Sequence, residues 1–252
     1  MPQVEDRLPV QAVMIVPTYN EVENLEPLLK QLLDLRAGLG VVVVDDNSPD
    51  GTGQLADRLA AEHPNEVRVL HRPGKMGLGS AYRAGFKRAL ELGVPLILTM
   101  DADFSHNPRY IPAMLALARE CDLVIGSRYV PGGGAEGCTP WRVALSRGAN
   151  LFAKVMLGLR AHDCTAGFRC YRSEVFRKID PDTIFSDGYS FLIEMLYRVE
   201  HVGLRVGEVP IVFVNRQRGA SKISRNEIAR AVGTVWRLWW EKMWSKASNV
   251  SR

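Results

Sequence analysis

Short apolar runs alternate with amphipathic segments along the first half of the chain. Apolar runs rich in β-branched residues predict strands, and apolar residues at helical spacing predict helices between them. The predicted strands are 12–16, 41–44, 67–70, 96–100 and 123–126, and the predicted helices are 23–34, 52–61, 77–92 and 110–119. Such alternation is typical of βαβ units, so we predict an α/β fold with a mostly parallel sheet flanked by helices.

The second half of the chain is less regular. We predict helices at 141–157, 190–202 and 226–244, strands at 168–171 and 206–214, and a mobile glycine-rich loop at 130–139. Pro210 interrupts the last strand, so we expect this strand at a sheet edge or with a bulge. No linker divides the chain, which predicts a single domain.

Composition narrows the class of partner. The 252 residues are 46% hydrophobic and 24% charged, with a net charge of +4. This mild basic excess suits phosphate-bearing substrates or an anionic membrane surface, and it is too weak to indicate nucleic-acid binding. The four cysteines form no CxxC pair, which predicts reduced thiols and neither a zinc site nor a disulfide framework.

The chain shows no sign of export or of a membrane span. Its N-terminus lacks the basic and then apolar form of a signal peptide. No apolar stretch reaches the roughly 18 residues that a bilayer crossing needs. We therefore expect a cytoplasmic protein, or one bound peripherally to the cytosolic face of a membrane.

Two carboxylates directly follow the strand predicted at 96–100. Asp101 and Asp103 lie one residue apart, where they repel each other unless a cation lies between them. Open α/β sheets bind ligands beyond the carboxyl ends of their strands. Mg²⁺ or Mn²⁺ held by one or two carboxylates and completed by substrate phosphates fits this placement, whereas a short acidic pair on its own is more often a solvated turn.

Further polar residues follow the first two predicted strands. Pro17 should end the first strand, because it cannot continue a central ladder. Tyr19 has a ring that stacks on a flat base, and Glu21 accepts hydrogen bonds. The adjacent Asp45 and Asp46 can accept from a base N–H or a ribose hydroxyl. The alternative is that both segments only form turns and helix caps.

The segment 72–79 combines spaced glycines with a lysine before a predicted helix. It resembles a phosphate-binding turn. It does not match the GxxxxGK[ST] pattern, which excludes a P-loop. A glycine-rich turn without a ligand is the alternative.

Taken together in order, the motifs VPTYNE (16–21), VDDNSPDGT (44–52), GLGSAY (77–82), MDADFSH (100–106) and GSRYVPGG (126–133) resemble the inverting family 2 glycosyltransferases of GT-A fold. The segments LSRGAN (145–150), DCTAGFRC (163–170), DGYSF (187–191) and 213–222 narrow the resemblance to dolichol- or polyprenol-phosphate mannose synthases. The resemblance covers about residues 11–225 and implies a GT-A, Rossmann-like fold. It implies mannose transfer from GDP-mannose to a polyprenyl phosphate, with a divalent metal.

The resemblance also implies roles for particular residues. The positions that hold guanine and ribose are Pro17, Tyr19, Glu21 and Asp46, with Asp45 as a further contributor. The metal and diphosphate positions are Asp101, Ala102 and Asp103, and those that grip the lipid phosphate are Arg128, Arg142 and Ser146. Arg216 and Lys222 match a mobile loop that closes over the phosphates. Asp103 and Arg128 are the residues on which catalysis should depend most. Ser105 replaces a glutamine that serves as a further metal ligand in some members, and a hydroxyl is a weaker ligand.

The reaction that the resemblance implies needs no strong general base. A lipid phosphate is already anionic at pH 7, so it requires positioning and charge screening. This agrees with a predicted site rich in arginine and lysine. We interpret His106 as a structural residue behind the metal pair.

The predicted last helix carries a broad apolar arc with three tryptophans, opposite Arg230, Arg237 and Glu241. Tryptophan with basic residues is typical of a helix at a membrane interface, and packing on the core is the alternative. We thus expect a catalytic unit at 1–225, followed by an amphipathic, membrane-facing helix and tail at 226–252. Many members of the family carry transmembrane segments and others use separate membrane subunits, so a separate anchoring subunit or a fused domain remains open.

Two alternative functions stay open on the sequence. A polyprenyl-phosphate glucosyltransferase that uses UDP-glucose keeps the same fold. A non-catalytic module that binds a sugar nucleotide is the other, and the complete set of acidic and basic residues argues against it.

Overall fold

A seven-stranded sheet lies at the centre of the protein, which is described by a computed structural model over residues 8–215 and 225–250. The strands are β1 (Ala12–Thr18), β2 (Leu39–Asp45), β3 (Val67–His71), β4 (Leu96–Thr99), β5 (Leu123–Ser127), β7 (Arg169–Arg172) and β8 (Val206–Pro210), in the order β3-β2-β1-β4-β7-β5-β8. Strand β7 is antiparallel to both of its neighbours, and the other pairs are parallel. The prediction of a mostly parallel α/β sheet is confirmed.

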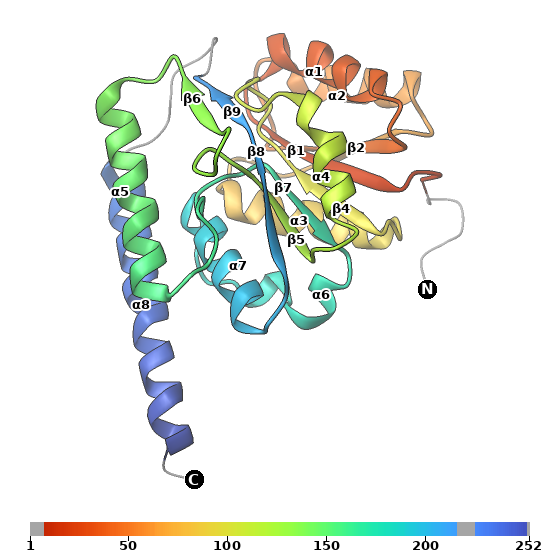
Figure 1. The fold of residues 1–252 in the computed structure, drawn as a ribbon. Helices are drawn as coiled ribbons and strands as arrows, with labels where there is room; N and C mark the ends of the chain where they lie inside the picture. Colours follow the sequence, from red (N-terminus) through yellow and green to blue (C-terminus); the bar gives the residue numbers. More distant parts are fainter. Residues whose placement is uncertain (1–7, 216–224, 251–252) are drawn as a thin grey trace.

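Helices cover both faces of this sheet (Figure 1). One face packs against α1 (Val22–Asp34), α2 (Thr52–Glu62) and α4 (Ile111–Leu117), which follows the 3₁₀ turn η2 (Pro108–Tyr110). The other packs against α3 (Leu78–Glu91), α5 (Pro140–Leu157), α6 (Val175–Lys178), α7 (Ser190–His201) and α8 (Arg225–Val250); the 3₁₀ turn η3 (Pro181–Thr183) lies between α6 and α7.

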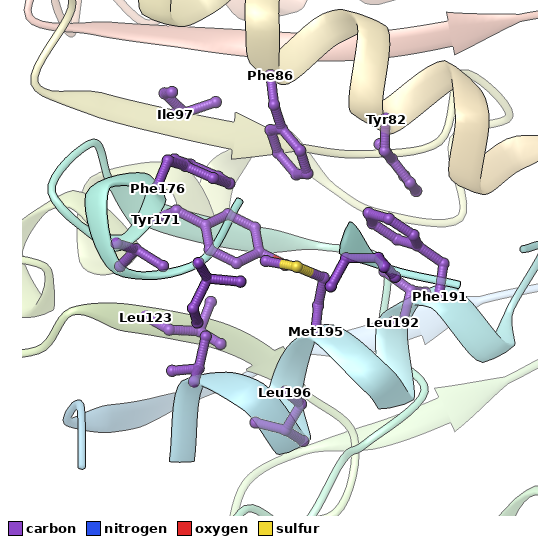
Figure 2. Packing of buried hydrophobic residues seen from close by; sticks show 14 of the residues in the cluster. Tyr82, Phe86, Ile97, Leu123, Tyr171, Phe176, Phe191, Leu192, Met195 and Leu196 are labelled. Carbon is purple, nitrogen blue, oxygen red and sulfur yellow. The ribbon is translucent and has the colours of Figure 1, made fainter. Parts of the chain in front are cut away.

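Alternate side chains of each central strand enter different cores. In β2, Val42 and Val44 belong to one hydrophobic cluster, and Val41 and Val43 belong to the other. Because successive strand residues point to opposite faces and both faces are covered, the strand reads as an unbroken apolar run. On the α3 side the core is aromatic, with the rings of Phe86 and Phe176 4.6 Å apart between their centroids (Figure 2).

The prediction that Pro17 ends the first strand is wrong. Strand β1 continues through Pro17 to Thr18 and stays paired with β2. The backbone carbonyl of Thr18 faces β2, where it accepts from the Asp46 amide at 3.1 Å. Pro17 therefore faces the opposite side, toward β4, whose pairing with β1 has already ended at Ile15. The missing N–H of the proline consequently breaks no ladder hydrogen bond.

The segment predicted as one strand at 206–214 divides at its proline. Strand β8 forms the edge of the main sheet, as expected, and β9 (Val212–Val214) pairs with β6 (Gly134–Glu136) in a separate two-stranded sheet. Strand β6 lies inside the stretch predicted as a loop at 130–139. Its short pairing comes from a distant segment, which a local pattern does not reveal.

Helices α5 and α8 lie side by side, and α8 extends past the rest of the molecule (Figure 1). Val235 and Leu238 of α8 are buried in the core, so this helix does pack on the protein. Within the part of the chain that the structure describes, no helix combines the length and apolar character that a bilayer crossing requires.

Candidate active site

The candidate site lies where the central strands end. Strands β1, β2, β4 and β5 run in the same direction, since β7 is antiparallel to both β4 and β5. Their carboxyl ends therefore share one edge of the sheet. The residues that follow them, including Asp46, Asp101 and Arg128, meet at this edge although up to 82 positions separate them in the chain.

A cavity of about 460 Å³ opens at this edge. It is lined by the predicted donor and metal residues Pro17, Tyr19, Glu21, Asp46, Asp101, Ala102 and Asp103, and by the predicted acceptor residues Arg128, Arg142 and Ser146. The structure thus brings both predicted groups to a single cavity. A volume of this size falls in the range of ordinary small-molecule sites.

Asp45 is the exception among the predicted residues that the structure describes. It does not line the cavity, and its carboxylate accepts hydrogen bonds from the hydroxyls of Thr18 (3.0 Å) and Ser48 (2.6 Å) and from the Ser48 amide (3.1 Å). These bonds occupy both oxygens of a side chain that is 1% exposed. Asp45 accordingly holds the turn after β2, and its position gives no support to a contact with the donor.

Asp46 has a partner that the sequence did not suggest. Its Oδ1 atom lies 2.9 Å from Nη1 of Arg72, and both side chains are largely buried. Burial raises the pKa of the Asp46 carboxyl, and the Arg72 guanidinium limits that rise. The contact lacks the alignment of a hydrogen bond, so Arg72 offsets the charge of a carboxylate that lines the cavity and leaves its Oδ1 atom without a hydrogen-bond donor.

Lys75 is a cavity residue that the sequence analysis did not assign. Its ammonium lies 4.4 Å from the centre of the Tyr19 ring. A cation over the face of a tyrosine is attracted by the ring electrons. Lys75 lies inside the glycine-rich segment 72–79, so the signal that could have identified it was the resemblance to a phosphate-binding turn.

The amino end of α3, which follows this turn, faces a carboxylate. Asp187 accepts a hydrogen bond from the Ser80 amide at 3.3 Å. A Cβ atom at Gly79 would lie 2.6 Å from Asp187 Oδ1, so glycine permits this close approach. The helix terminus where a phosphate was expected is therefore occupied by a side chain of the protein.

Asp101 and Asp103 are the cavity carboxylates that follow β4. The Ser105 amide donates to Oδ1 of Asp103 at 3.0 Å, which fixes that carboxylate after β4. The described residues contain no group of three or more acidic, histidine or cysteine side chains able to hold a metal. Two carboxylates nevertheless fit Mg²⁺ or Mn²⁺, because such ions often take their remaining ligands from water and substrate phosphates. The Ser105 hydroxyl, in the same loop, is buried in the cavity wall without a hydrogen-bond partner, so it is a further oxygen available to a ligand there.

His106 is a buried residue of the same loop. Its Nδ1 atom accepts from the Asp101 amide at 3.5 Å, and its ring stacks on Phe168 and meets the edge of Phe213. Burial lowers the pKa of His106 to about 4. The imidazole is thus neutral at pH 7, and its contacts are those of a structural residue, although it also borders the cavity.

Arg128 is held by a buried carboxylate. Its Nε and Nη2 atoms donate to the two oxygens of Asp163, each at 2.7 Å, and Nη2 also donates to Thr165 at 2.8 Å. Burial would raise the pKa of Asp163, but the Arg128 hydrogen bonds and charge outweigh it and the pKa ends below its usual value. The pair is therefore fully charged at neutral pH.

The other two predicted acceptor residues project from α5. Arg142 donates from Nη1 to Asn215 Oδ1 at 3.0 Å, and Ser146 accepts from the Tyr129 hydroxyl at 2.7 Å. Both lie on the cavity wall, one helical turn apart. The structure thus joins α5 to the strand end after β9 and to the loop after β5.

Helix α8 also reaches the cavity, through Glu227 and Arg230 of its first turns. No local pattern in the sequence indicated this, because it depends on how α8 packs on the rest of the molecule. Arg216 and Lys222 lie outside the described residues, so their predicted contact with the phosphates stays a prediction.

Large apolar side chains are exposed on the neighbouring helices α5 and α8. They are Trp141, Leu145, Leu151 and Val155 of α5, and Ile228, Val232, Trp236, Trp240, Met243 and Trp244 of α8. Trp141 is 74% exposed and Trp240 is 59% exposed. We call these ten residues the α5/α8 face. The sequence indicated only the part on α8.

Comparison with known proteins identifies the family. The model of the family described as glycosyl transferase family 2 matches residues 13–180. The chain belongs to glycosyl transferase family 2. It is 47% identical over 228 residues to an undecaprenyl-phosphate mannosyltransferase of Micrococcus luteus, an alignment that covers 90% of this chain and 93% of the relative. It is 46% identical over 227 residues to a polyprenol monophosphomannose synthase of Mycolicibacterium smegmatis, with 89% and 85% covered.

Solved structures agree with this family at the level of the fold. A glucosyl-3-phosphoglycerate synthase of Mycobacterium tuberculosis, crystallised with Mn²⁺, UDP and glucosyl-3-phosphoglycerate, superposes with a TM-score of 0.63 at 18% identity, covering 91% of this chain and 80% of the other. A mannosyl-3-phosphoglycerate synthase of Rubrobacter xylanophilus gives 0.62 at 23% identity, covering 95% and 75%. The prediction of a GT-A fold is confirmed.

Proposed function

We propose that this family 2 enzyme transfers mannose from GDP-mannose to a polyprenyl phosphate. The names of both curated relatives support mannose as the sugar and a polyprenyl phosphate as the acceptor. GDP as the nucleotide rests on the resemblance of 16–21 and 44–52 to the donor motifs of mannose synthases.

One observation carries this proposal, namely that the pair of carboxylates after β4 and two guanidinium groups line one cavity. Asp101 and Asp103 are the proposed metal-binding carboxylates, and Arg128 and Arg142 are the proposed partners of the acceptor phosphate. A donor diphosphate bound through a metal and a free acceptor phosphate need opposite kinds of partner. A cavity with both can hold the two substrates next to each other.

On the donor side, Tyr19 offers its ring to the base, and Glu21 and Asp46 offer carboxylate oxygens to base or ribose donors. The Arg72 guanidinium lies beside Asp46 and favours the charged form of this carboxyl, which burial disfavours. Asp101 and Asp103 would hold the divalent metal, with the Ser105 hydroxyl close by. When bound, Mg²⁺ or Mn²⁺ supplies charge neutralisation for the departing diphosphate.

On the acceptor side, Arg128, Arg142 and Ser146 would bind the lipid phosphate. Its anionic oxygen attacks the anomeric carbon of mannose as the bond to the diphosphate breaks. Attack on the face opposite to the diphosphate inverts the anomer, so an α-linked donor gives a β-linked mannosyl phosphate. No proton has to be removed from the nucleophile, which agrees with a neutral His106 whose Nδ1 already accepts the Asp101 amide.

We place the reaction at the cytosolic face of a membrane, with the α5/α8 face against the bilayer. Both helices that carry this face also line the cavity, through Arg142 and Ser146 on α5 and Arg230 on α8. A polyprenyl chain cannot leave a water-filled cavity without exposing apolar surface. Exposed tryptophans on the two helices that line the cavity would let the lipid pass from the membrane to the site.

A turnover assay tests the function. The chain is incubated with GDP-[¹⁴C]mannose, a short polyprenyl phosphate and Mg²⁺, beside a matched reaction with UDP-glucose. We expect radiolabelled lipid from GDP-mannose alone, and loss of the product when EDTA removes the metal. Transfer from UDP-glucose at an equal or higher rate would replace the mannosyl assignment with the glucosyl one.

A further inference from the structure

We propose that Asp163 is a positioning residue that fixes which edge of the Arg128 guanidinium faces the acceptor phosphate. This inference rests on the proposed function of the cavity. It gives a role to Asp163, which does not itself line the cavity. Asp163 acts through Arg128.

The geometry leaves one edge of the guanidinium for a ligand. Asp163 engages Nε and Nη2 of Arg128 and accepts its backbone amide at 3.1 Å. Thr165 takes a further contact from Nη2. Among the described contacts, Nη1 has no partner, and Arg128 lines the cavity, so this nitrogen is the one available to an incoming phosphate.

The orientation is set before any ligand arrives. Asp163 is 0% exposed, so its carboxylate cannot exchange Arg128 for water. A bidentate arginine–carboxylate pair fixes direction as well as distance. Rigid presentation lowers the entropy lost on binding, because the side chain need not be ordered at that moment.

The loop that carries Asp163 is itself fastened from the sheet edge. Glu208 of β8 accepts the amides of His162 at 2.9 Å and Asp163 at 3.1 Å. Glu208 therefore supports Asp163 without touching Arg128 in the contacts that the structure describes. Glu200 of α7 offers a matched comparison, because it accepts the amides of Arg160 and Ala161 at 2.7 and 3.0 Å two residues earlier in the same loop.

The same set of hydrogen bonds reaches Ser146, another of the three predicted acceptor residues. Asn150 of α5 donates to the Ser146 carbonyl at 2.8 Å and to Thr165 Oγ1 at 3.1 Å, and it accepts the Cys164 amide at 2.6 Å. Asp163, Thr165 and Asn150 thus connect Arg128 to α5. These hydrogen bonds therefore also set the spacing between Arg128 and Ser146.

The test is Asp163→Asn, which preserves shape but removes the charge and places an amide N–H against the guanidinium. Calorimetry should show binding of a short polyprenyl phosphate weakened about tenfold or more, while GDP with Mg²⁺ binds within about twofold of wild type. In the transfer assay, the KM for the acceptor should rise by a similar factor with little change in kcat, because the contact exists before and during the reaction. Unchanged acceptor affinity, or an equal loss for both ligands, overturns the proposal.

A double-mutant cycle separates positioning from general damage. If Asp163 acts only through Arg128, then Arg128→Ala and Arg128→Ala/Asp163→Asn should bind the acceptor with affinities within about twofold. If the double variant instead loses acceptor affinity by the product of the two single losses, the inference is contradicted.

A second pair of variants covers the case in which Asp163→Asn does not fold. Glu208→Gln should weaken acceptor binding about threefold or more, and Glu200→Gln should leave it unchanged. Equal effects of Glu208→Gln and Glu200→Gln on acceptor binding would contradict the positioning role of Asp163. Calorimetry with the lipid phosphate does not require transfer. A wild-type protein that binds both substrates without turnover would therefore contradict the proposed function, and the binding comparison between wild type and Asp163→Asn would still decide the role of Asp163.

Discussion

Gly85 and Ile15 lie in direct contact, with helix α3 pressed against strand β1. A Cβ atom at Gly85 would lie 2.5 Å from Cγ2 of Ile15, which is closer than real carbon atoms approach. Gly85 is buried in α3, and Ile15 lies in the central part of β1. Because β1 contains Pro17 and leads directly into Tyr19, this contact helps to place the donor side of the cavity.

We predict that Gly85→Ala destabilises the protein by about 1–3 kcal/mol, since an extra methyl group overpacks a closed site. Gly148→Ala in α5 is the matched control, because a Cβ there has nothing within 4 Å. That change should stabilise by up to about 1 kcal/mol through helix propensity. Urea unfolding of both variants gives the free energies, and equal effects would contradict the packing argument.

Asp103→Asn should lower transfer at least about 100-fold. The amide can still accept the Ser105 N–H that the carboxylate accepts at 3.0 Å, so stability should change by less than about 1 kcal/mol. The measurements are turnover with saturating Mg²⁺ and thermal unfolding. Glu91→Gln, on the exposed end of α3, is the control for a lost surface carboxylate. Wild-type turnover in the Asp103 variant would remove this residue from the metal site.

Arg142→Ala should weaken the acceptor and spare the donor. Loss of a charge-assisted contact is worth about 1.5–3 kcal/mol, which corresponds to roughly a 10- to 150-fold rise in the KM for polyprenyl phosphate. Arg147→Ala is the matched control, since Arg147 is an exposed arginine of the same helix that does not line the cavity. A comparable loss in both variants would indicate general attraction between α5 and the lipid.

Charges placed in the α5/α8 face should release the protein from membranes. We expect Trp240→Glu and Val155→Glu each to reduce co-sedimentation with anionic vesicles several-fold, because burying a charge at an interface is costly. Transfer to a short, water-soluble acceptor should persist, since these positions do not line the cavity. Leu90→Glu, at an exposed apolar position on α3, should bind vesicles as wild type does.

Thiol labelling tests the burial of the cysteines. Burial raises the pKa values of Cys164 and Cys170 to about 12, so at pH 8 only roughly one thiol in ten thousand is the reactive thiolate. The native protein should therefore react quickly at no more than the two partly exposed residues, Cys121 and Cys138. In denaturant all four should react. Rapid labelling of Cys164 in the native state would show that the loop beside Asp163 opens.

The order of the first strands and helices was determined by the sequence. Strands such as β2 are covered on both faces, so their apolar runs are unbroken and easily recognised. The place of Asp101 and Asp103 at the cavity could be predicted for a related reason. A carboxylate pair at the end of a buried strand needs no long-range information to be placed at the ligand-binding edge of a parallel sheet.

Tertiary structure alone decided what depends on segments far apart in the chain. The antiparallel insertion of β7 between β4 and β5, and the pairing of β6 with β9, join segments whose local patterns do not name a partner. Asp45 and Asp46 are neighbours in the sequence, yet only the folded chain shows that one is enclosed by Thr18 and Ser48 and the other lines the cavity.

The same holds for the support of the site. Asp163 lies 35 residues from Arg128, and its carboxylate meets that guanidinium because β5 and the loop before β7 end at the same edge. The contribution of α5 to the exposed apolar face likewise appears only when α5 lies beside α8. Hydrophobic periodicity is a local property that the sequence displays directly, whereas the partner of a side chain is set by packing between elements.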